Sequence, residues 1–108
     1  MIPKVIHWDP QWGPISEEAM SRILRAEGFS VSKYHYPSGT YFPMHTHAED
    51  KKDTVLRGRL RIAWESGAAV LEAGDMIEIP AGARHSAEVV GPETVVSLDA
   101  TRLPGRTG

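Results

Sequence analysis

The chain has 108 residues, with 12 Lys and Arg against 14 Asp and Glu, which gives a formal net charge of −2 at pH 7. This length suits a single domain, which we expect to span 1–108. The charge balance argues against a nucleic-acid partner, because nucleic-acid-binding domains usually carry a basic face. The chain has no Cys, which excludes disulfides, thiol catalysis and thiolate metal sites, so any metal must be bound by His, Asp or Glu.

The sequence also lacks the signals of membrane insertion and export. No apolar run approaches the roughly 20 residues that a helix needs to cross a bilayer. The first four residues, Met-Ile-Pro-Lys, do not begin a signal peptide. We therefore expect a cytoplasmic protein with no membrane partner.

The N-terminal part, 1–28, is predicted to contain an irregular segment followed by one short helix. Proline and glycine residues interrupt 1–15, so no regular element should extend far there, although Trp8 and Trp12 should pack against something. The helix is predicted over 17–27, because Ser16 is a favourable N-cap and Gly28 follows the last turn. It is the only helix that we expect.

The rest of the chain, 29–102, is predicted to form short β-strands. The apolar pattern changes to a period of two after Gly28, and turn-forming residues recur about every ten positions. About eight strands at this spacing indicate a sandwich or a barrel. The predicted strands are 29–36, 40–45, 52–56, 59–65, 68–71, 76–79, 85–90 and 94–100.

Three of the five histidines are candidate metal ligands. His45 and His47 are two residues apart in an extended segment, so their imidazoles should share one face. His85 begins a later strand directly after a tight turn, and it can supply a third donor. Neutral imidazole binds Zn, Cu, Fe and Ni, and three imidazoles leave coordination positions open for water or a substrate.

These positions resemble the two conserved motifs of the cupin family. The first motif is a Gly, five residues, a His-x-His pair and a closing Gly, which here are Gly39, His45, His47 and Gly58. The second is a Gly, five residues, Pro-x-Gly, two residues and a His, which here are Gly74, Pro80, Gly82 and His85. The resemblance covers about 39–89. It implies an all-β, cupin-like double-stranded β-helix, or jelly-roll barrel, with a divalent transition metal (Fe, Mn, Ni, Co, Cu or Zn) bound by His45, His47 and His85.

The sequence departs from the cupin pattern at one ligand. Cupins usually place a Glu ligand seven residues before the closing Gly, where this chain has Lys51. An ammonium group cannot bind a metal, so Glu49, Asp50 or Asp53 must replace the missing Glu, or the site has only three protein ligands. Asp53 is preferred because it shares a strand face with Lys51. A simpler interpretation is that 49–53 forms a charged loop over the rim of the barrel.

Several other side chains are candidates for the barrel cavity. Asp53 and His35 are the candidate acid–base residues, since His35 lies two positions before the turn at Pro37. Arg84 is a weaker candidate for binding an anionic substrate, because it neighbours His85 and should point the other way. The candidate lining residues, each of which also fits an ordinary core position, are Tyr34, Tyr36, Tyr41, Phe42, Met44, Trp64 and Met76.

The resemblance to cupins with three His ligands, which include cysteine dioxygenase-like enzymes, implies a metal-dependent, oxygenase-type enzyme acting on a small molecule. An isomerase or a lyase is a less favoured reaction class. The alternative is a non-catalytic module that binds or senses a small ligand in the same pocket, and a scaffold subunit is a third reading. Because cupins are commonly dimers, we expect a homodimer, with the segment around Trp8 and Trp12 covering its own barrel or crossing to the partner.

Overall fold

The computed structural model describes residues 3–103, and it contains one α-helix, one 3-10 helix and nine strands in two antiparallel sheets. The helices are η1 (Pro10–Trp12) and α1 (Glu17–Ala26). The strands are β1 (Lys4–Ile6), β2 (Ser30–Tyr36), β3 (Tyr41–His45), β4 (Asp50–Thr54), β5 (Arg59–Trp64), β6 (Gly67–Leu71), β7 (Met76–Ile79), β8 (His85–Val90) and β9 (Val95–Arg102).

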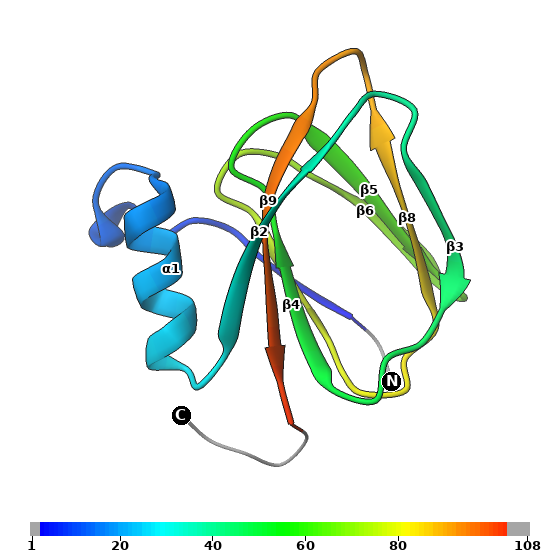
Figure 1. Ribbon diagram of the computed structural model, residues 1–108, viewed down its shortest axis with the longest axis horizontal. Helices are drawn as coiled ribbons and strands as arrows, with labels where there is room; N and C mark the ends of the chain where they lie inside the picture. Colours follow the sequence, from blue (N-terminus) through cyan, green and yellow to red (C-terminus); the bar gives the residue numbers. More distant parts are fainter. Residues whose placement is uncertain (1–2, 104–108) are drawn as a thin grey trace.

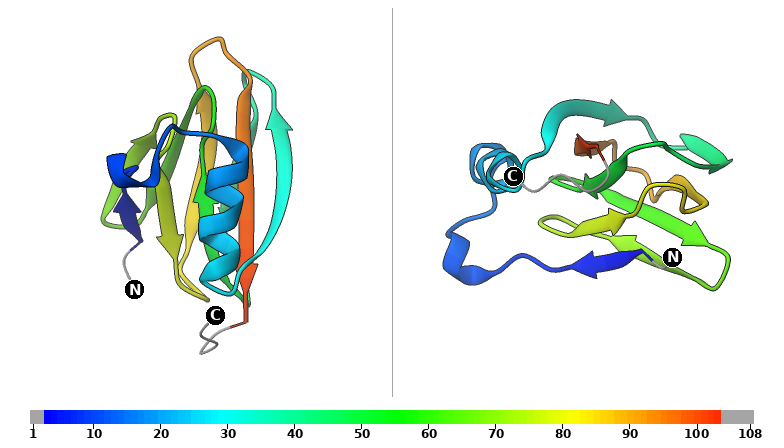
Figure 2. Two further views of the ribbon diagram at one scale, coloured as in Figure 1. Left: turned by 90° about the vertical axis from the view of Figure 1, so that its left-hand side faces the viewer. Right: turned by 90° about the horizontal axis from the view of Figure 1, so that it is seen from below.

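The two sheets face each other, and α1 lies outside them (Figure 1). The five-stranded sheet has the order β1-β7-β4-β9-β2, and the four-stranded sheet has the order β3-β8-β5-β6. Helix α1 packs on β2 and β9, so the five-stranded sheet is covered on both faces (Figure 2). The predicted all-β jelly-roll fold with one short N-terminal α-helix is therefore confirmed.

Two apolar cores follow from this layering. One lies between the sheets and the other lies between α1 and the outer face of the five-stranded sheet. Strand β9 contributes side chains to both cores, since Val95 packs in the first core while Leu98 and Ala100 pack in the second. Alternation along a strand sends successive side chains to opposite faces, so the inward positions after Val95 are Ser97 and Asp99.

The N-terminal segment is more regular than the sequence predicted. Residues Lys4–Ile6 form β1, which pairs with β7 in register Val5 to Ile77, and a 3-10 helix follows at Pro10–Trp12. The Asp9 side chain caps this turn by accepting the backbone N–H of Gln11 at 2.8 Å. The structure thus adds one short 3-10 turn to the single predicted α-helix, because a proline at the first position and an aspartate cap suffice for such a turn.

The two tryptophans of this segment pack on their own chain. The Trp8 and Trp12 rings meet edge to face, with centroids 5.1 Å apart, and both rings contact the core beneath α1. The Trp8 indole N–H donates to the carbonyl of Gly13 at 2.8 Å. Of the two arrangements expected for this segment, the structure has the one that covers its own sheet.

All eight predicted strands are present, with ends that agree to within two residues. The charged segment before and within the third of them has a different structure from the one that its composition suggested. The interpretation of 49–53 as a charged loop was wrong, because β4 pairs with both β7 and β9 and so lies inside the five-stranded sheet. Lys51 and Lys52 are buried on opposite faces of this strand. Lys52 is tolerated there because its ammonium is 2.7 Å from the Glu27 carboxylate.

Residues 3–103 contain no helix with the length and hydropathy required to span a membrane.

Candidate metal centre

The imidazoles of His45, His47 and His85 come together at one edge of the four-stranded sheet. His45 ends β3 and His85 begins β8, and the two residues stand directly opposite each other in the antiparallel pair. His47 lies two residues beyond β3, in the loop toward β4. Its carbonyl accepts the backbone N–H of Gly82 at 2.9 Å, which ties this loop to the turn before His85.

Gly82 illustrates why this turn needs glycine. Its φ of 81° lies in the left-handed region, which other residues adopt only with strain. The same turn leads to Ala83, whose carbonyl is 3.0 Å from His85 Nδ1. The local conformation of the second motif thus fixes both the position and the orientation of the His85 ring.

The orientation of two rings leaves their Nε2 atoms free for a metal. His45 Nδ1 is 2.6 Å from the carbonyl of Pro43, and His85 Nδ1 has its carbonyl partner at Ala83. A carbonyl oxygen only accepts, so each Nδ1 carries the proton and each Nε2 has a free lone pair. Backbone carbonyls that hold metal-binding histidines in this way are a common feature of metal sites.

The three rings fit a single transition-metal ion. One ligand atom from each ring lies within 4.8 Å of the other two, and the Nε2 atoms of His45 and His47 are 3.0 Å apart. Two nitrogens that bind one ion at about 2.1 Å and at a right angle are themselves about 3.0 Å apart. The spacing therefore suits an ion with His45 and His47 in adjacent coordination positions.

The electrostatic environment favours the neutral form of two of these imidazoles, those of His47 and His85. Burial lowers the pKa of His85 below its usual value, and the charges of His45, His47 and Lys51 lower it further, against the hydrogen bond to Ala83, which raises it. Burial also lowers the pKa of His47, assisted by His45 and Lys51. Neutral imidazole is the form that binds metal, so the rings are ready to bind at neutral pH.

A cavity of about 120 Å³ opens in front of the imidazoles, between the two sheets. Pockets for drug-sized ligands are larger, about 300–1,000 Å³, so this one suits a small molecule. Its lining residues are Tyr36, Phe42, His45, His47, Lys51, Asp53, Leu60, His85, Ala87, Ser97 and Asp99.

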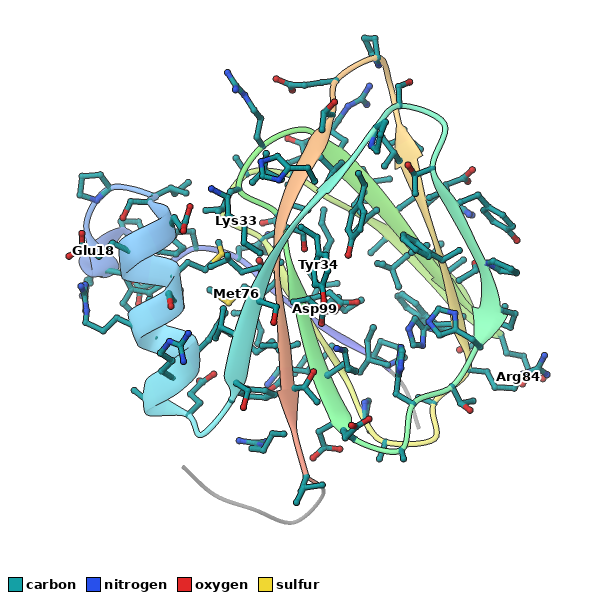
Figure 3. The ribbon with its side chains drawn as sticks, viewed as in Figure 1. Glu18, Lys33, Tyr34, Met76, Arg84 and Asp99 are labelled. Carbon is teal, nitrogen blue, oxygen red and sulfur yellow. The ribbon has the colours of Figure 1, made fainter. Side chains whose placement is uncertain are left out.

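The five-stranded sheet contributes three charged side chains to this cavity, which we call the acid wall: Lys51, Asp53 and Asp99. Asp53 of β4 is directly opposite Asp99 of β9, and Lys51 is opposite Thr101. Opposite residues of adjacent antiparallel strands point to the same face, so these side chains all project toward the four-stranded sheet. Figure 3 shows Asp99 on that side of the sheet, whereas Met76 lies on the side of α1.

The ammonium group of Lys51 is bound within the acid wall. It forms an ion pair with Asp99 and donates to the Thr101 hydroxyl at 2.8 Å. Its side chain is only 10% exposed, so the charge does not extend to solvent. The residue that replaces the usual cupin Glu therefore acts as a buried counter-ion.

Asp53 has an unusual protonation behaviour for a carboxyl group. Part of its surface faces the cavity, but protein surrounds the carboxyl on its other sides, and this burial raises the pKa of Asp53 to about 7. The charge of Asp99 and a hydrogen bond with its side chain raise the pKa as well, while Lys51 lowers it. Asp53 thus changes charge near neutral pH, a property typical of acid–base residues.

The structure brings together only some of the candidate site residues. Asp53 lines the cavity with the three histidines, whereas His35 is exposed on β2 and is not part of the cavity. Strand alternation explains this difference, because Tyr36 is the residue of that pair that points inward. His35 is therefore not placed to act as an acid–base residue in this cavity.

The other candidates for the missing Glu ligand are also outside the site. Asp50 accepts the backbone N–H of Ala81 at 2.9 Å, and neither Asp50 nor Glu49 lines the cavity. Among residues 3–103, only the three histidines group together as potential ligands at this site. The centre therefore has three imidazole donors, and the nearby carboxyl groups belong to the opposite sheet.

Of the seven candidate lining residues, Tyr36 and Phe42 line the cavity. Their rings meet edge to face with centroids 5.1 Å apart, and burial raises the pKa of Tyr36 well above its usual value, so its hydroxyl remains a donor. The remaining five are elsewhere: Tyr34, Tyr41 and Met44 are exposed, and Trp64 and Met76 pack in the cores. Arg84 is exposed and points away from the barrel (Figure 3).

Asp99 is the residue that the sequence analysis missed. It lies between the buried apolar residues Leu98 and Ala100 of β9, and a charged residue within a largely buried strand is a signal of a buried function. The face-sharing residues Val95, Ser97, Asp99 and Thr101 mark its inward direction by alternation. Its pairing with Asp53, however, depends on a strand register that the sequence does not reveal.

Comparison with known proteins identifies the family and the fold. A family model described as "Cupin domain" matches residues 32–101. No curated protein sequence matches this chain significantly.

Solved structures resemble this one at low sequence identity. A cupin-2 domain-containing protein from Shewanella frigidimarina has 26% identity and a TM-score of 0.57, with 68% of this chain and 71% of that chain covered. A double-stranded β-helix protein from Klebsiella pneumoniae has 26% identity and a TM-score of 0.60, with 77% and 72% covered. A DMSP lyase from Ruegeria pomeroyi has 21% identity and a TM-score of 0.64, with 77% of this chain but only 42% of the lyase covered.

Proposed function

The chain belongs to the cupin family, and from this premise we propose that it is a metal-dependent enzyme of the oxygenase type that acts on a small molecule in the barrel. His45, His47 and His85 would hold a divalent transition metal, which supplies Lewis acidity and a binding site for the substrate. The observation that carries the proposal is the convergence of three imidazoles on a cavity that also contains Asp53.

Different residues that line the cavity have different proposed roles. A metal held by the three imidazoles would keep further coordination positions for water or for a donor atom of the substrate. Tyr36 and Phe42 supply an apolar surface with one hydroxyl donor, and they limit the size of the substrate. Asp53 is the proposed acid–base residue, because its carboxyl changes charge near neutral pH and faces the same cavity.

The test is oxygen uptake by the purified protein after reconstitution with Fe(II) or Mn(II). A panel of small thiols, diketones and phenols is supplied as substrates, and the His85→Ala variant serves as the matched control. The proposal predicts uptake that depends on both the metal and one substrate class. Product formation without oxygen uptake would contradict an oxygenase and would indicate a lyase or an isomerase instead.

Binding without turnover would favour a different function. If the reconstituted protein binds a small ligand but yields no product with any of the panel, the cavity serves a non-catalytic binding or sensing module. A protein that binds no metal after reconstitution contradicts the proposed metal-dependent enzyme.

We further propose that the protein acts in the cytoplasm as a homodimer. Exposed apolar side chains occur on both edge strands of the four-stranded sheet, with Tyr41 of β3 at 60% exposure and Val70 of β6 at 45%. Such side chains are candidates for a contact between two copies. Sedimentation equilibrium tests the dimer, and a monomer at all concentrations would contradict it.

A further inference from the structure

The acid wall is a second chemical group in the cavity, separate from the histidines. The three imidazoles belong to the four-stranded sheet and the loop after β3, whereas Lys51, Asp53 and Asp99 belong to β4 and β9 of the facing sheet. Both groups line the same cavity of about 120 Å³. A small molecule in this space therefore contacts the imidazole end and the acid wall at the same time.

The charges of the acid wall balance only when one carboxyl group is protonated. Two carboxylates directly opposite each other on adjacent strands repel, and one ammonium group neutralises only one of them. Lys51 pairs with Asp99 and is held by the Thr101 hydroxyl, so its charge is committed to that carboxylate. Asp53 is left without a cation of its own, so of the two carboxyl groups it is the one that takes up a proton.

The other groups around Asp53 do not replace this cation. Strand β7, which pairs with β4 on the other side, places the apolar Ile77 opposite Asp53. Strand β2 contributes the neutral Tyr36, and the four-stranded sheet with the loop after β3 contributes the imidazoles of His45, His47 and His85, of which burial favours the neutral form of the last two. The charge of Lys51 is thus the only formal positive charge among the residues that line the cavity.

We propose that Lys51, Asp53 and Asp99 form a proton-accepting site, and that the protein takes small, weakly acidic ligands whose anion binds at the histidine end while Asp53 keeps their proton. This inference rests on the proposed metal site. In the step, the ligand O–H bond breaks and its electron pair stays on the ligand oxygen. A new O–H bond forms on the Asp53 carboxylate, so no proton is released to solvent.

Lys51 and Asp99 act as positioning residues in this step. Without Asp99, Asp53 becomes the partner of Lys51 and stays ionised, so it no longer accepts the proton. Without Lys51, two carboxyl groups share the wall with no cation, and Asp53 is already protonated before the ligand arrives. Both changes remove proton uptake, but they move the titration of Asp53 in opposite directions.

The experiment measures the number of protons released when acetohydroxamic acid binds to the protein loaded with Ni(II). Titration calorimetry at pH 7.5, in buffers that differ in ionisation enthalpy, gives this number. The small acid is protonated in solution and binds metals as its anion. The wild-type protein should release less than about half a proton per ligand, and the Asp53→Asn variant should release about one, because Asp53 is mostly ionised at this pH and accepts the proton.

Two further variants keep the result interpretable. Asp99→Asn should also release about one proton, and it retains a carboxylate to pair with the buried Lys51. Glu88→Gln removes an exposed carboxylate on β8 that lies 3.8 Å from Arg61, so it should behave as the wild type. Equal proton release by the wild type and Asp53→Asn, with the ligand bound in both, would overturn the inference and leave the metal site intact.

Carbon-13 NMR of aspartate-labelled, metal-free protein provides a separate measurement of the acid wall. One carboxyl group should titrate near pH 7, and this titration should vanish in Asp53→Asn, move downward in Asp99→Asn and move upward in Lys51→Met. If Ni(II) does not bind at all, the proposed function fails while this titration still tests the wall. Titration of every aspartate near pH 4 would overturn the inference regardless of metal.

Discussion

The two walls of the cavity present opposite kinds of chemistry. The histidine end consists of imidazole donors that are close together in sequence or joined by one strand pair, and backbone carbonyls fix the orientation of His45 and His85. The acid wall consists of charged groups from β4 and β9, held by an ion pair and by the register of these strands. The proposed metal ligands and the proposed proton acceptor thus lie on different walls of the cavity, so each function should be removable without the other.

The largest expected effect is on stability, from loss of the cation in the acid wall. Lys51→Met leaves Asp99 and Asp53 buried without a counter-ion, and it should lower the free energy of unfolding by about 3 kcal/mol at pH 8. The loss should shrink at pH 5, where the carboxyl groups are protonated more easily. Urea denaturation measures both values.

Lys33→Met is the control for this change. Its ion pair with Glu17 at 2.7 Å is exposed on both sides, so the free energy of unfolding should change by less than about 1 kcal/mol. If Lys51→Met is as mild as Lys33→Met at pH 8, the Lys51 charge is not committed to the wall.

The next effect separates the two walls by metal affinity. His85→Ala removes a direct ligand. Loss of a residue that only supports a ligand costs up to about 100-fold in metal affinity, so this change should weaken Ni(II) or Co(II) binding by at least about 100-fold. Asp53→Asn should change the affinity by less than about tenfold, because its side chain belongs to the facing sheet. Calorimetric titration with the metal salt measures both dissociation constants.

His35→Ala is the matched control, because it removes an exposed imidazole outside the cavity and should leave metal affinity unchanged. A large loss of affinity in Asp53→Asn with little loss in His85→Ala would reverse the assignment of the two walls.

A smaller effect concerns the dependence of stability on pH. Since Asp53 titrates at about 7 in the folded protein and at 3.8 ordinarily, the folded state binds more protons between these values, and stability falls as pH rises from 4 to 7. In Asp53→Asn the amide donates to Asp99 in place of the protonated carboxyl, and this decline disappears. Relative to the wild type, the metal-free variant should therefore gain about 2–4 kcal/mol of unfolding free energy between pH 4 and pH 8.

Thermal or urea unfolding of the metal-free wild type and of Asp53→Asn between pH 4 and pH 8 measures how the stability of each protein depends on pH. Parallel pH profiles for the wild type and Asp53→Asn would show that Asp53 does not hold a proton in the folded state.

The smallest effect near neutral pH is on metal retention. Burial lowers the pKa of His47 and His85, so protons compete weakly with the metal at pH 7 and strongly only in more acidic solution. Metal content after dialysis should change little between pH 7.5 and pH 6.5 and should be lost by pH 4. Full retention at pH 4 would contradict a site made of imidazoles alone.

The sequence predicted one wall and missed the other for a physical reason. Spacing within a strand and a turn suffices to bring His45, His47 and His85 together, because each motif fixes its own backbone. Asp53 and Asp99 are 46 positions apart, and they meet only through the register of β4 with β9. A one-residue shift of that register would separate them, and no local pattern sets it.

The strand β4 shows a second limit of sequence reasoning. Four of its five residues are charged, a composition typical of a loop, yet it pairs on both sides within the sheet. Backbone hydrogen bonds to β7 and β9, with ion pairs for both lysines, outweigh the low strand propensity of these residues. Such compensation depends on Glu27 and Asp99, which are distant in sequence.

X-ray absorption spectroscopy of the protein loaded with Co(II) or Fe(II) tests the central claim most directly. Three imidazoles on one ion predict three nitrogen neighbours at about 2.0–2.1 Å, with the outer-shell scattering of imidazole rings and the remaining positions filled by oxygen. In the His85→Ala protein, one imidazole should be lost from this shell. A shell of oxygen atoms alone, or one unchanged by the substitution, would contradict the assignment of the centre to His45, His47 and His85.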